Sequence, residues 1–343
     1  MRRLLNILFV TTEDVYLTLD GENVVVRREL AVVARFPLHT LEGIISFSYA
    51  GASPALMGAC AERGVGLSFC TLSGRFLARV SGEANGNVLL RRKQYRMADD
   101  EIASCSIAKA MVFGKVHNAR WSIDRTLRDH RMRVDAEKME KTAKHLQLAL
   151  SSILDKTNLE SLRGIEGEAA ALYFGVFDEM ILKSKETFFF HERNRRPPLD
   201  NVNAMLSFVY SLLCGDCASA LESVGLDSYV GFLHRDRPGR SSLALDLMEE
   251  LRTAFADRFV LTIINTGVMT SADFEKRESG AVILTDKGRK KLLTSWQERK
   301  RETITHPFLK EKMSWGLVPY TQALLLGRFL RGDIDGYPPF LWK

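Results

Sequence analysis

Several signals of membrane and secreted proteins are missing from this sequence. Its longest apolar runs fall short of the ~18 residues that a membrane-spanning helix needs. The N-terminal stretch MRRLLNILFV carries two arginines and a short apolar run, but acidic residues follow at once, without a small-residue cleavage site. This stretch therefore predicts a first strand and not a signal peptide. We expect no membrane segment.

Cysteine is scarce as well, with five cysteines in 343 residues. An odd number in so large a chain argues against a disulfide framework and indicates a reducing compartment, the cytoplasm. We find no internal repeat and no low-complexity tract. With 46% apolar and 26% charged residues, the composition is that of an ordinary folded protein, and the length allows about two domains.

The charge balance is mildly basic, since 48 lysines and arginines stand against 42 aspartates and glutamates. This excess permits nucleic-acid binding without requiring it. The basic residues are clustered, however. The densest groups are residues 287–301 (KGRKKLLTSWQERKR) and residues 191–200 (HERNRRPPLD). Each group is either a surface for phosphates or a solvated helix face, and the sequence leaves both interpretations open.

The composition changes near residue 95. Before it lie short apolar and β-branched runs separated by turn signals, which predict strands. These runs are LLNILFV, VYLTL, NVVVRR, GIISFS, VGLSFC and FLARVSG. DGEN at residues 20–23 predicts a hairpin turn. SPALMGACAER at residues 53–63 predicts a helix that ends at Gly64.

Long helical patterns dominate the sequence after residue 95. They cover residues 98–118, 120–153, 159–182, 201–222 and 243–257, with more between 288 and 331. Residues 278–293 (ESGAVILTDKGRKKLL) predict either a strand pair or a strand followed by a helix. We therefore predict an α+β fold, with a small β-rich N-terminal domain (residues 1–95) and a larger all-helical domain (residues 96–343).

One acid in the helical part breaks the local pattern. A helix over LRGIEGEAAALYF (162–174) and beyond has an apolar stripe of Leu162, Ile165, Ala169, Tyr173 and Met180. Glu166 falls in the middle of that stripe, whereas Glu168 falls to one side. A carboxylate on the core face is costly unless it is paired, protonated or bound to a metal. Gly164 and Gly167 each cost roughly 1 kcal/mol of helix stability relative to alanine. The segment predicts a site around Glu166.

Candidate partners for Glu166 lie in residues 228–265. An apolar run ends at His234, and a charged loop with proline and glycine follows it. On the next predicted helix, Asp246 and Glu249 are three residues apart, so both carboxylates can face the same point. A histidine with carboxylates from separate helices suits a hard metal ion. The alternative is that His234 ends a strand and that both acids are solvated, because they lie opposite the apolar stripe of their helix.

Three motifs in this order resemble one known family. They are G-I-E-G-x-A-A-x-x-Y-F around Glu166, G-F-L-H ending at His234 and D-L-M-E-E-L-R beginning at Asp246. The family is the CRISPR-associated spacer integrase, a metal-dependent DNA nuclease and integrase with an N-terminal β domain and a C-terminal helical domain. The resemblance covers essentially the whole chain, and residues 306–343 resemble the subtype I-C branch.

The resemblance implies a catalytic metal site made of Glu166, His234, Asp246 and Glu249, with Mg²⁺ or Mn²⁺ as the cofactor. A histidine among carboxylates favours Mn²⁺ somewhat. We expect the glycines beside Glu166 to let a neighbouring helix or a DNA strand approach. The expected DNA contacts are Arg193, Arg195, Arg196, Asn203, Tyr210, Arg252, Lys290 and Lys291. For Asn203 and Tyr210, helix packing is the alternative.

The implied reaction is phosphoryl transfer in CRISPR adaptation: the 3′-hydroxyl of a short DNA fragment attacks a phosphodiester of the CRISPR repeat. The implied partners are double-stranded DNA, a second copy bound through the β domain, and a small companion nuclease that completes a heterohexamer. One alternative is a structure-specific metallonuclease that cleaves branched or single-stranded DNA. The other is a non-catalytic DNA-binding scaffold, in which the acids only form ion pairs.

Overall fold

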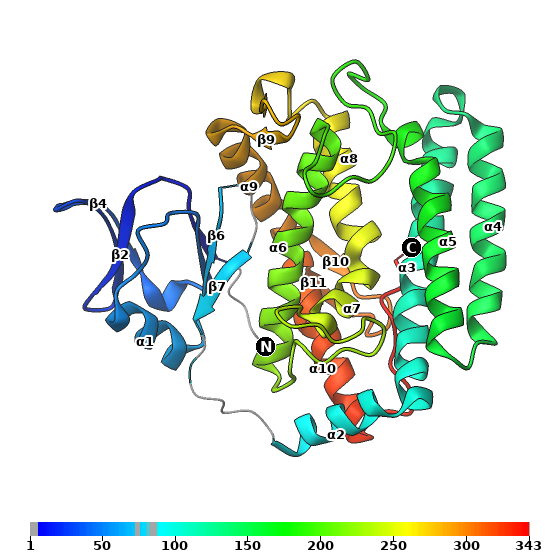
Figure 1. The fold of residues 1–343 in the computed structure, drawn as a ribbon, viewed down its shortest axis with the longest axis horizontal. Helices are drawn as coiled ribbons and strands as arrows, with labels where there is room; N and C mark the ends of the chain where they lie inside the picture. The colour runs from blue at the N-terminus through cyan, green and yellow to red at the C-terminus, as the bar shows by residue number, and fades with distance from the viewer. Residues whose placement is uncertain (1–5, 73–75, 81, 83–87, 343) are drawn as a thin grey trace.

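The computed structural model describes residues 6–72, 76–80, 82 and 88–342. A β-rich part that extends to Val80 lies at one end of the molecule, and a larger helical part follows it (Figure 1). The predicted α+β class is confirmed. The first helix of the second part, α2, spans Val88–Asp99, so residue 95 lies inside a helix that packs against the helical part.

Two sheets form most of the β-rich part. In one, three strands are antiparallel neighbours: β2 (Val15–Asp20), β3 (Asn23–Arg28) and β4 (Ala31–Pro37). The other has the order β1 (Ile7–Val10), β5 (Gly43–Ser46), β6 (Gly66–Cys70) and β7 (Phe76–Val80). Helix α1 (Pro54–Arg63) contacts both β2 and β6. Alternating inward residues such as Val15, Leu17 and Ile44 therefore join both sheets in one core.

The local turn and cap signals are confirmed. Asp20 pairs with Asn23 across the predicted hairpin, and Gly21 has the positive φ of 56° that such a turn requires. Gly64, with φ 65°, ends α1. The prediction omitted β4, because the turn before it has positive φ at Glu29 and no glycine. Residues 4 and 5 of the predicted first strand lie outside the described residues.

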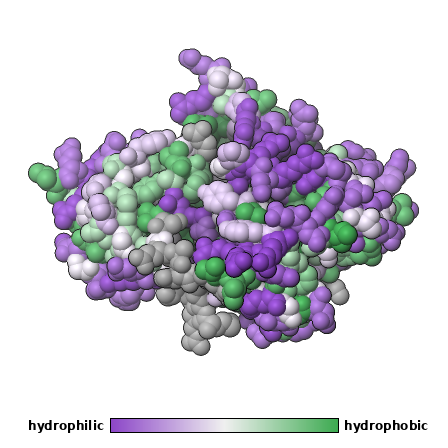
Figure 2. Space-filling view, turned by 60° about the horizontal axis from the view of Figure 1, so that its bottom comes forward, coloured by the Kyte–Doolittle hydropathy of each residue, from purple (hydrophilic) through white to green (hydrophobic). Residues whose placement is uncertain are grey.

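Strand β4 is an edge of its sheet and exposes apolar side chains. Leu30 beside it is 95% exposed, Val32 is 44% exposed and Val33 is 55% exposed. Figure 2 shows pale and hydrophobic residues on the β-rich part at the left, whereas hydrophilic residues dominate the helical part. An exposed apolar edge strand invites pairing with another chain.

Helix α3 (Glu101–His130) is the centre of the helical part, because it contacts α2, α4, α5 and α7. The remaining helices are α4 (Ala136–Leu154), α5 (Leu159–Gly175), α6 (Asn201–Ser223), α7 (Ser242–Leu251), α8 (Arg258–Asn265), α9 (Asp286–Arg301) and α10 (Val318–Arg331). In Figure 1, α3, α4 and α5 lie side by side at the end opposite the sheets. Helix α7 packs between α3 and α6.

Three expectations for the helical part are wrong. The helix predicted over residues 120–153 is interrupted, because α3 ends at His130 and α4 begins at Ala136. The helix break predicted near residue 119 is absent, since α3 runs unbroken to His130. The part is also not all-helical, because it holds two hairpins, formed by β8 (Phe274–Lys276) with β9 (Val282–Leu284) and by β10 (Thr303–Thr305) with β11 (Lys312–Ser314). Residues 278–293 are a strand followed by a helix, β9 and α9, which is one of the two predicted arrangements.

Helix α6 corrects the expectation about membrane-length segments. It is the one helix among the described residues that is long and apolar enough to cross a bilayer. Counting uninterrupted apolar runs missed it, because isolated polar residues divide its sequence. Of its most apolar window, 67% is buried inside the protein, and α6 packs against α7 and α10. It is therefore a core helix of the fold.

The C-terminal residues fasten α7 to α3. Phe340 donates its backbone N–H to Glu250 Oε2 at 2.7 Å, and Tyr337 also donates its hydroxyl to Glu250. Asn118 of α3 donates to the backbone carbonyls of Glu250 and Phe340, both at 2.8 Å. Trp342 in turn donates its backbone N–H to Asn118. These bonds fix α7, which carries two of the predicted site acids, against the central helix.

Candidate metal centre

Helix α5 brings Glu166 against the central helix. The buried residues of its inner face are Leu162, Ala169 and Tyr173. Glu166 lies at the margin of this face with a 24% exposed side chain, and its carboxylate forms an ion pair with Lys115 of α3. Glu168 is exposed. The prediction that Glu168 faces water is therefore confirmed. Glu166 faces inward as predicted, but from the margin of the apolar stripe and not from its middle.

The glycines beside Glu166 face open space. A Cβ atom at Gly164 or at Gly167 would meet nothing within 4 Å, and both residues are exposed. The expectation that they admit a neighbouring helix is wrong. The approach of a DNA strand to this bare stretch of α5 stays a prediction.

The segment that ends at His234 is held by a side chain. The backbone N–H groups of Phe232, Leu233 and His234 donate to the carboxylate of Asp246 at 2.6, 2.9 and 3.0 Å. No strand forms between residues 228 and 241, so the interpretation of His234 as the end of a strand is wrong. The donors that a neighbouring strand would need are bonded to Asp246 instead.

Gly231 lets this segment approach α7. A Cβ atom at this position would lie 2.8 Å from Asp246 Oδ2 and 2.9 Å from the backbone carbon of Ser242. Both separations are too short for any other residue. The first letter of the G-F-L-H motif is therefore required by packing, a role that the sequence analysis did not assign.

Asp246 uses all of its acceptor capacity within the protein. It is fully buried, and besides the three backbone groups it binds the ring of His234, with 2.5 Å between Oδ1 and Nδ1. A carboxylate offers about four lone-pair sites, and these four bonds occupy them. Such a pair fixes the orientation of a histidine whose other nitrogen binds a metal. The interpretation of Asp246 as a solvated acid is therefore wrong. Its contacts are those of a residue that orients the His234 ring.

Glu249 is the second buried acid, so the solvated alternative is wrong for it too. Its side chain is 5% exposed, and its Oε2 accepts from Lys115 Nζ at 2.7 Å and from Arg252 at 3.1 Å. Burial works to raise the pKa of Glu249, but the charges of Arg252 and Lys115 outweigh burial and lower this pKa to about 2. Glu249 is therefore ionised at neutral pH, and Lys115 lies between it and Glu166.

Arg252 begins a π-helical segment, Arg252–Asp257, that joins α7 to α8. Such segments often occur at functional sites. Its guanidinium lies 4.6 Å from the ring centre of Tyr210, and Arg193 lies 5.3 Å from the same ring. Burial works to lower the pKa of Arg252, but Glu249 and other neighbours hold it above its ordinary value. Arg252 is therefore a permanent charge.

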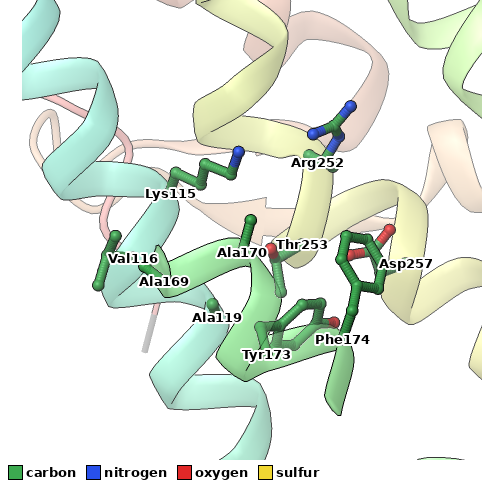
Figure 3. A pocket seen from close by; sticks show the side chains of 10 residues that line it. All are labelled: Lys115, Val116, Ala119, Ala169, Ala170, Tyr173, Phe174, Arg252, Thr253 and Asp257. Atoms are coloured by element: carbon green, nitrogen blue, oxygen red, sulfur yellow. The ribbon is translucent and has the colours of Figure 1, made fainter. Parts of the chain in front are cut away.

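Behind the site lies a small cavity of about 10 Å³. Lys115, Tyr173, Arg252 and Asp257 are among the residues that line it (Figure 3). In Figure 3, Lys115 extends from α3 toward the side of the view where Arg252 and Asp257 lie, and Tyr173 lies below Ala170. The volume is close to the ~10–15 Å³ that one water needs. The cavity therefore has no room for a substrate.

The side chains of the site are of the types that bind a divalent cation, although their ligand atoms do not converge on one point. Glu166 and Glu249 supply carboxylate oxygens, and His234 has its Nε2 on the ring edge away from Asp246, a set suited to Mg²⁺ or Mn²⁺. A cation, the Lys115 ammonium, already lies between the two carboxylates. Within the described part of the chain, no three histidine, cysteine or acidic side chains are grouped closely enough to hold a metal ion.

The predicted DNA contacts fall into a buried group and an exposed group. Asn203 is fully buried and accepts a hydrogen bond from Arg193 at 2.7 Å, and Tyr210 is buried below both arginines. Their contacts match the helix-packing alternative. Arg195 and Arg196 are exposed.

In the second basic group, Lys290 is exposed, while Lys291 pairs with Asp273 at 2.6 Å. Three further basic residues of this group also have acidic partners: Arg289, Arg299 and Lys300. Much of its charge is therefore neutralised within the protein, and the surface available for phosphates is smaller than the sequence suggests.

The family model described as CRISPR associated protein Cas1 matches residues 8–298. The chain belongs to the Cas1 family. A CRISPR-associated endonuclease Cas1 from Chlorobaculum tepidum is 50% identical over 343 residues, which is 100% of both chains. The family prediction is therefore confirmed, as is the prediction of an endonuclease and integrase of CRISPR adaptation.

Two solved structures show the same fold. A Cas1 protein from Thermotoga maritima has a TM-score of 0.80 at 21% identity, covering 95% of this chain and 97% of that one. A Cas6-RT-Cas1–Cas2 complex contains a chain with a TM-score of 0.81 at 24% identity, covering 98% of this chain and 36% of that one. Cas1 proteins are generally metal-dependent. The I-C branch stays a prediction.

The sequence analysis missed Lys115. Its position carries the same signal that identified Glu166, because it is a charged residue on an inner helix face. On α3 it follows the buried residues Met111 and Val112 by four and three positions and immediately precedes buried Val116. A lysine at such a position needs an anionic partner.

Proposed function

We propose that this Cas1 protein joins DNA fragments to a CRISPR repeat at a divalent metal site formed by Glu166, His234 and Glu249. The observation that carries the proposal is the convergence of two carboxylates from separate helices on one buried cation, beside an oriented histidine. Asp246 orients His234 and does not bind the metal. Mg²⁺ and Mn²⁺ both suit these donors, and the histidine favours Mn²⁺.

The residues of the site then have distinct roles in phosphoryl transfer. A bound cation would lower the pKa of the attacking 3′-hydroxyl and stabilise charge on the phosphate. Arg252 keeps Glu249 ionised at neutral pH and places a fixed positive charge beside it. The exposed face of α5 next to Glu166 leaves room for a DNA strand. The reaction requires no covalent enzyme intermediate.

We propose that Arg195, Arg196 and Lys290 contact phosphates directly, because they are exposed. Arg193 and the buried contacts Asn203 and Tyr210 would support the residue 191–200 segment from below. Asn203 bonds to the backbone of Glu192 and Asn194 at 2.8 and 3.2 Å, which fixes this segment against α6. Lys291 and Arg252 would attract the DNA phosphates by their positive charge without contacting them, since an acid already pairs with each.

The proposed assembly is a homodimer through the β-rich part, residues 1–95, bridged by a small companion nuclease into a heterohexamer on double-stranded DNA. The exposed apolar edge at β4 supports the dimer. The similarity to a chain of a complex whose name includes Cas1 and Cas2 supports the companion. We place the protein in the cytoplasm and in the I-C branch.

The test is an integration assay with a 3′-hydroxyl DNA fragment and supercoiled DNA that carries a CRISPR repeat, with and without Mn²⁺. Wild type should give joined product, whereas Glu166→Ala and His234→Ala should give none. Glu168→Ala, on the exposed side of the same helix, is the matched control and should be nearly silent. Cleavage without joining would identify a structure-specific metallonuclease, and binding alone would identify a scaffold. Wild-type joining by Glu166→Ala in saturating Mn²⁺ would show that the site is wrong.

A further inference from the structure

Lys115 is a buried cation with two acidic partners. Its side chain is 7% exposed, and its ammonium contacts Glu166 and lies 2.7 Å from Glu249 Oε2. Burying an ammonium is costly unless it is paired and hydrogen-bonded. The two carboxylates come from α5 and α7, so the lysine on α3 joins three helices at the position where their charges meet.

A divalent ion bound by Glu166 and Glu249 would compete with this lysine for the same oxygens. In the structure, these two carboxylates already face two cations, Lys115 and Arg252. A metal ion adds two more positive charges, so one side chain has to give up its contacts. Arg252 is held by Glu249 and by the ring of Tyr210. Lys115 ends in a compact ammonium on a flexible four-carbon chain, so it is the group that can move.

We infer that Lys115 is an internal placeholder cation: it holds Glu166 and Glu249 together in the metal-free protein and releases them when a divalent ion binds. This inference rests on the proposed metal site. The placeholder prevents the repulsion of two carboxylates in a partly buried site and preserves the spacing of α5 and α7. Its cost is a weaker apparent affinity for the metal, because the ion binds only the fraction of molecules in which the lysine has withdrawn.

The first experiment measures Mn²⁺ binding by calorimetry and by the EPR signal of free Mn²⁺, without DNA. Lys115→Met keeps an unbranched side chain that ends at Cε and removes the ammonium. If the lysine occupies the site roughly nine-tenths of the time, the dissociation constant of this variant for Mn²⁺ should be about tenfold lower than that of wild type. Lys109→Met is the matched control on the same helix, where the ammonium of half-buried Lys109 donates to the backbone carbonyl of Leu154. It should bind Mn²⁺ like wild type. Equal or weaker binding by Lys115→Met would overturn the inference.

A second experiment uses the unmodified chain, in case Lys115→Met does not fold. Acetylation of lysines, followed by mass spectrometry, reports how accessible each ammonium is. Labelling of Lys115 should be slow in EDTA and several-fold faster in Mn²⁺, while labelling of Lys109 should not change. Labelling of Lys115 that is unchanged or slower in Mn²⁺ would mean that the lysine stays on the carboxylates, and the inference fails.

These outcomes separate the inference from the proposed function. If wild type and Glu166→Ala bind Mn²⁺ equally, the proposed metal site is wrong and the inference falls with it. If wild type binds Mn²⁺ and Glu166→Ala does not, the site is correct. Lys115→Met then tests the placeholder alone.

Discussion

Replacing Asp246 with asparagine tests whether this acid orients His234 or binds the metal. The change keeps the shape of the side chain but leaves one oxygen in place of two. Asparagine can still accept about two hydrogen bonds, and its NH₂ group would face N–H groups that now lack an acceptor. At least two of the four bonds are lost from a fully buried position.

The expected loss of stability is large. A hydrogen bond to a charged group contributes about 1.5–3 kcal/mol, so the loss of two amounts to about 3–6 kcal/mol. That is a large share of the ~5–15 kcal/mol by which folded proteins are stable. Urea unfolding in EDTA should therefore show a clearly lower midpoint for Asp246→Asn. Mn²⁺ affinity should fall about 10–100-fold and not vanish, because the histidine loses its orientation but the ligands remain.

Glu166→Gln is the matched control for Asp246→Asn. Its carboxylate is partly exposed and shares Lys115 with Glu249, so this variant should lose little stability in EDTA but most of its Mn²⁺ binding. Gly231→Ala should resemble Asp246→Asn, since its Cβ would displace the Asp246 carboxylate. The reasoning is refuted if Asp246→Asn unfolds like wild type in EDTA and yet binds no Mn²⁺, because Asp246 would then be a ligand.

The other predictions concern separate parts of the molecule. Gly167→Ala should raise the free energy of unfolding in urea by up to about 1 kcal/mol. It should also weaken DNA binding, and an unchanged DNA affinity would exclude a DNA strand at this face of α5. Reversing Arg195 and Arg196 to glutamate should reduce the slope of log K against log salt by about 2, and an unchanged slope would leave them as a solvated face. Val33→Glu on β4 should give monomers in light scattering, and a persistent dimer would exclude that edge. Burial raises the pKa of Asp257 to about 6, despite its bond to a tyrosine, so its contribution to stability is full below its unfolded pKa and is lost as pH rises through about 6. Asp257→Asn should remove that component of the pH dependence, and an unchanged profile would contradict the assignment.

The parts of the fold that the sequence predicts are those whose causes are local. The cap at Gly64 and the hairpin at Gly21 each depend on residues within one turn. The wrongly expected helix break near residue 119 has a distant cause. Asn118 lies where a helix break was expected, but its amide bonds to Glu250 and Phe340, far along the chain, and α3 continues past it.

The same distinction applies to the site. The inward position of Glu166 follows from helical periodicity, and the structure confirms it. The different roles of Asp246 and Glu249 do not follow, because spacing along α7 says only that both can face one way. Asp246 is saturated by a segment that begins fifteen residues upstream, at Gly231. That segment has the apolar run of a strand in sequence, but its backbone donors bond to Asp246, a partner that only the folded chain provides.

The exposure of the three acids indicates the direction from which a metal reaches the site. Asp246 is fully buried and has no acceptor capacity left, the side chain of Glu249 is 5% exposed, and that of Glu166 is 24% exposed. An ion arriving from solvent therefore meets Glu166 first. That carboxylate lies beside the bare surface at Gly164 and Gly167, where a DNA strand has room to approach. The metal ion and the DNA would then enter through the same opening. The positive charge of the ion would offset the negative charge of the DNA phosphate when the ion replaces Lys115 on the carboxylates of Glu166 and Glu249.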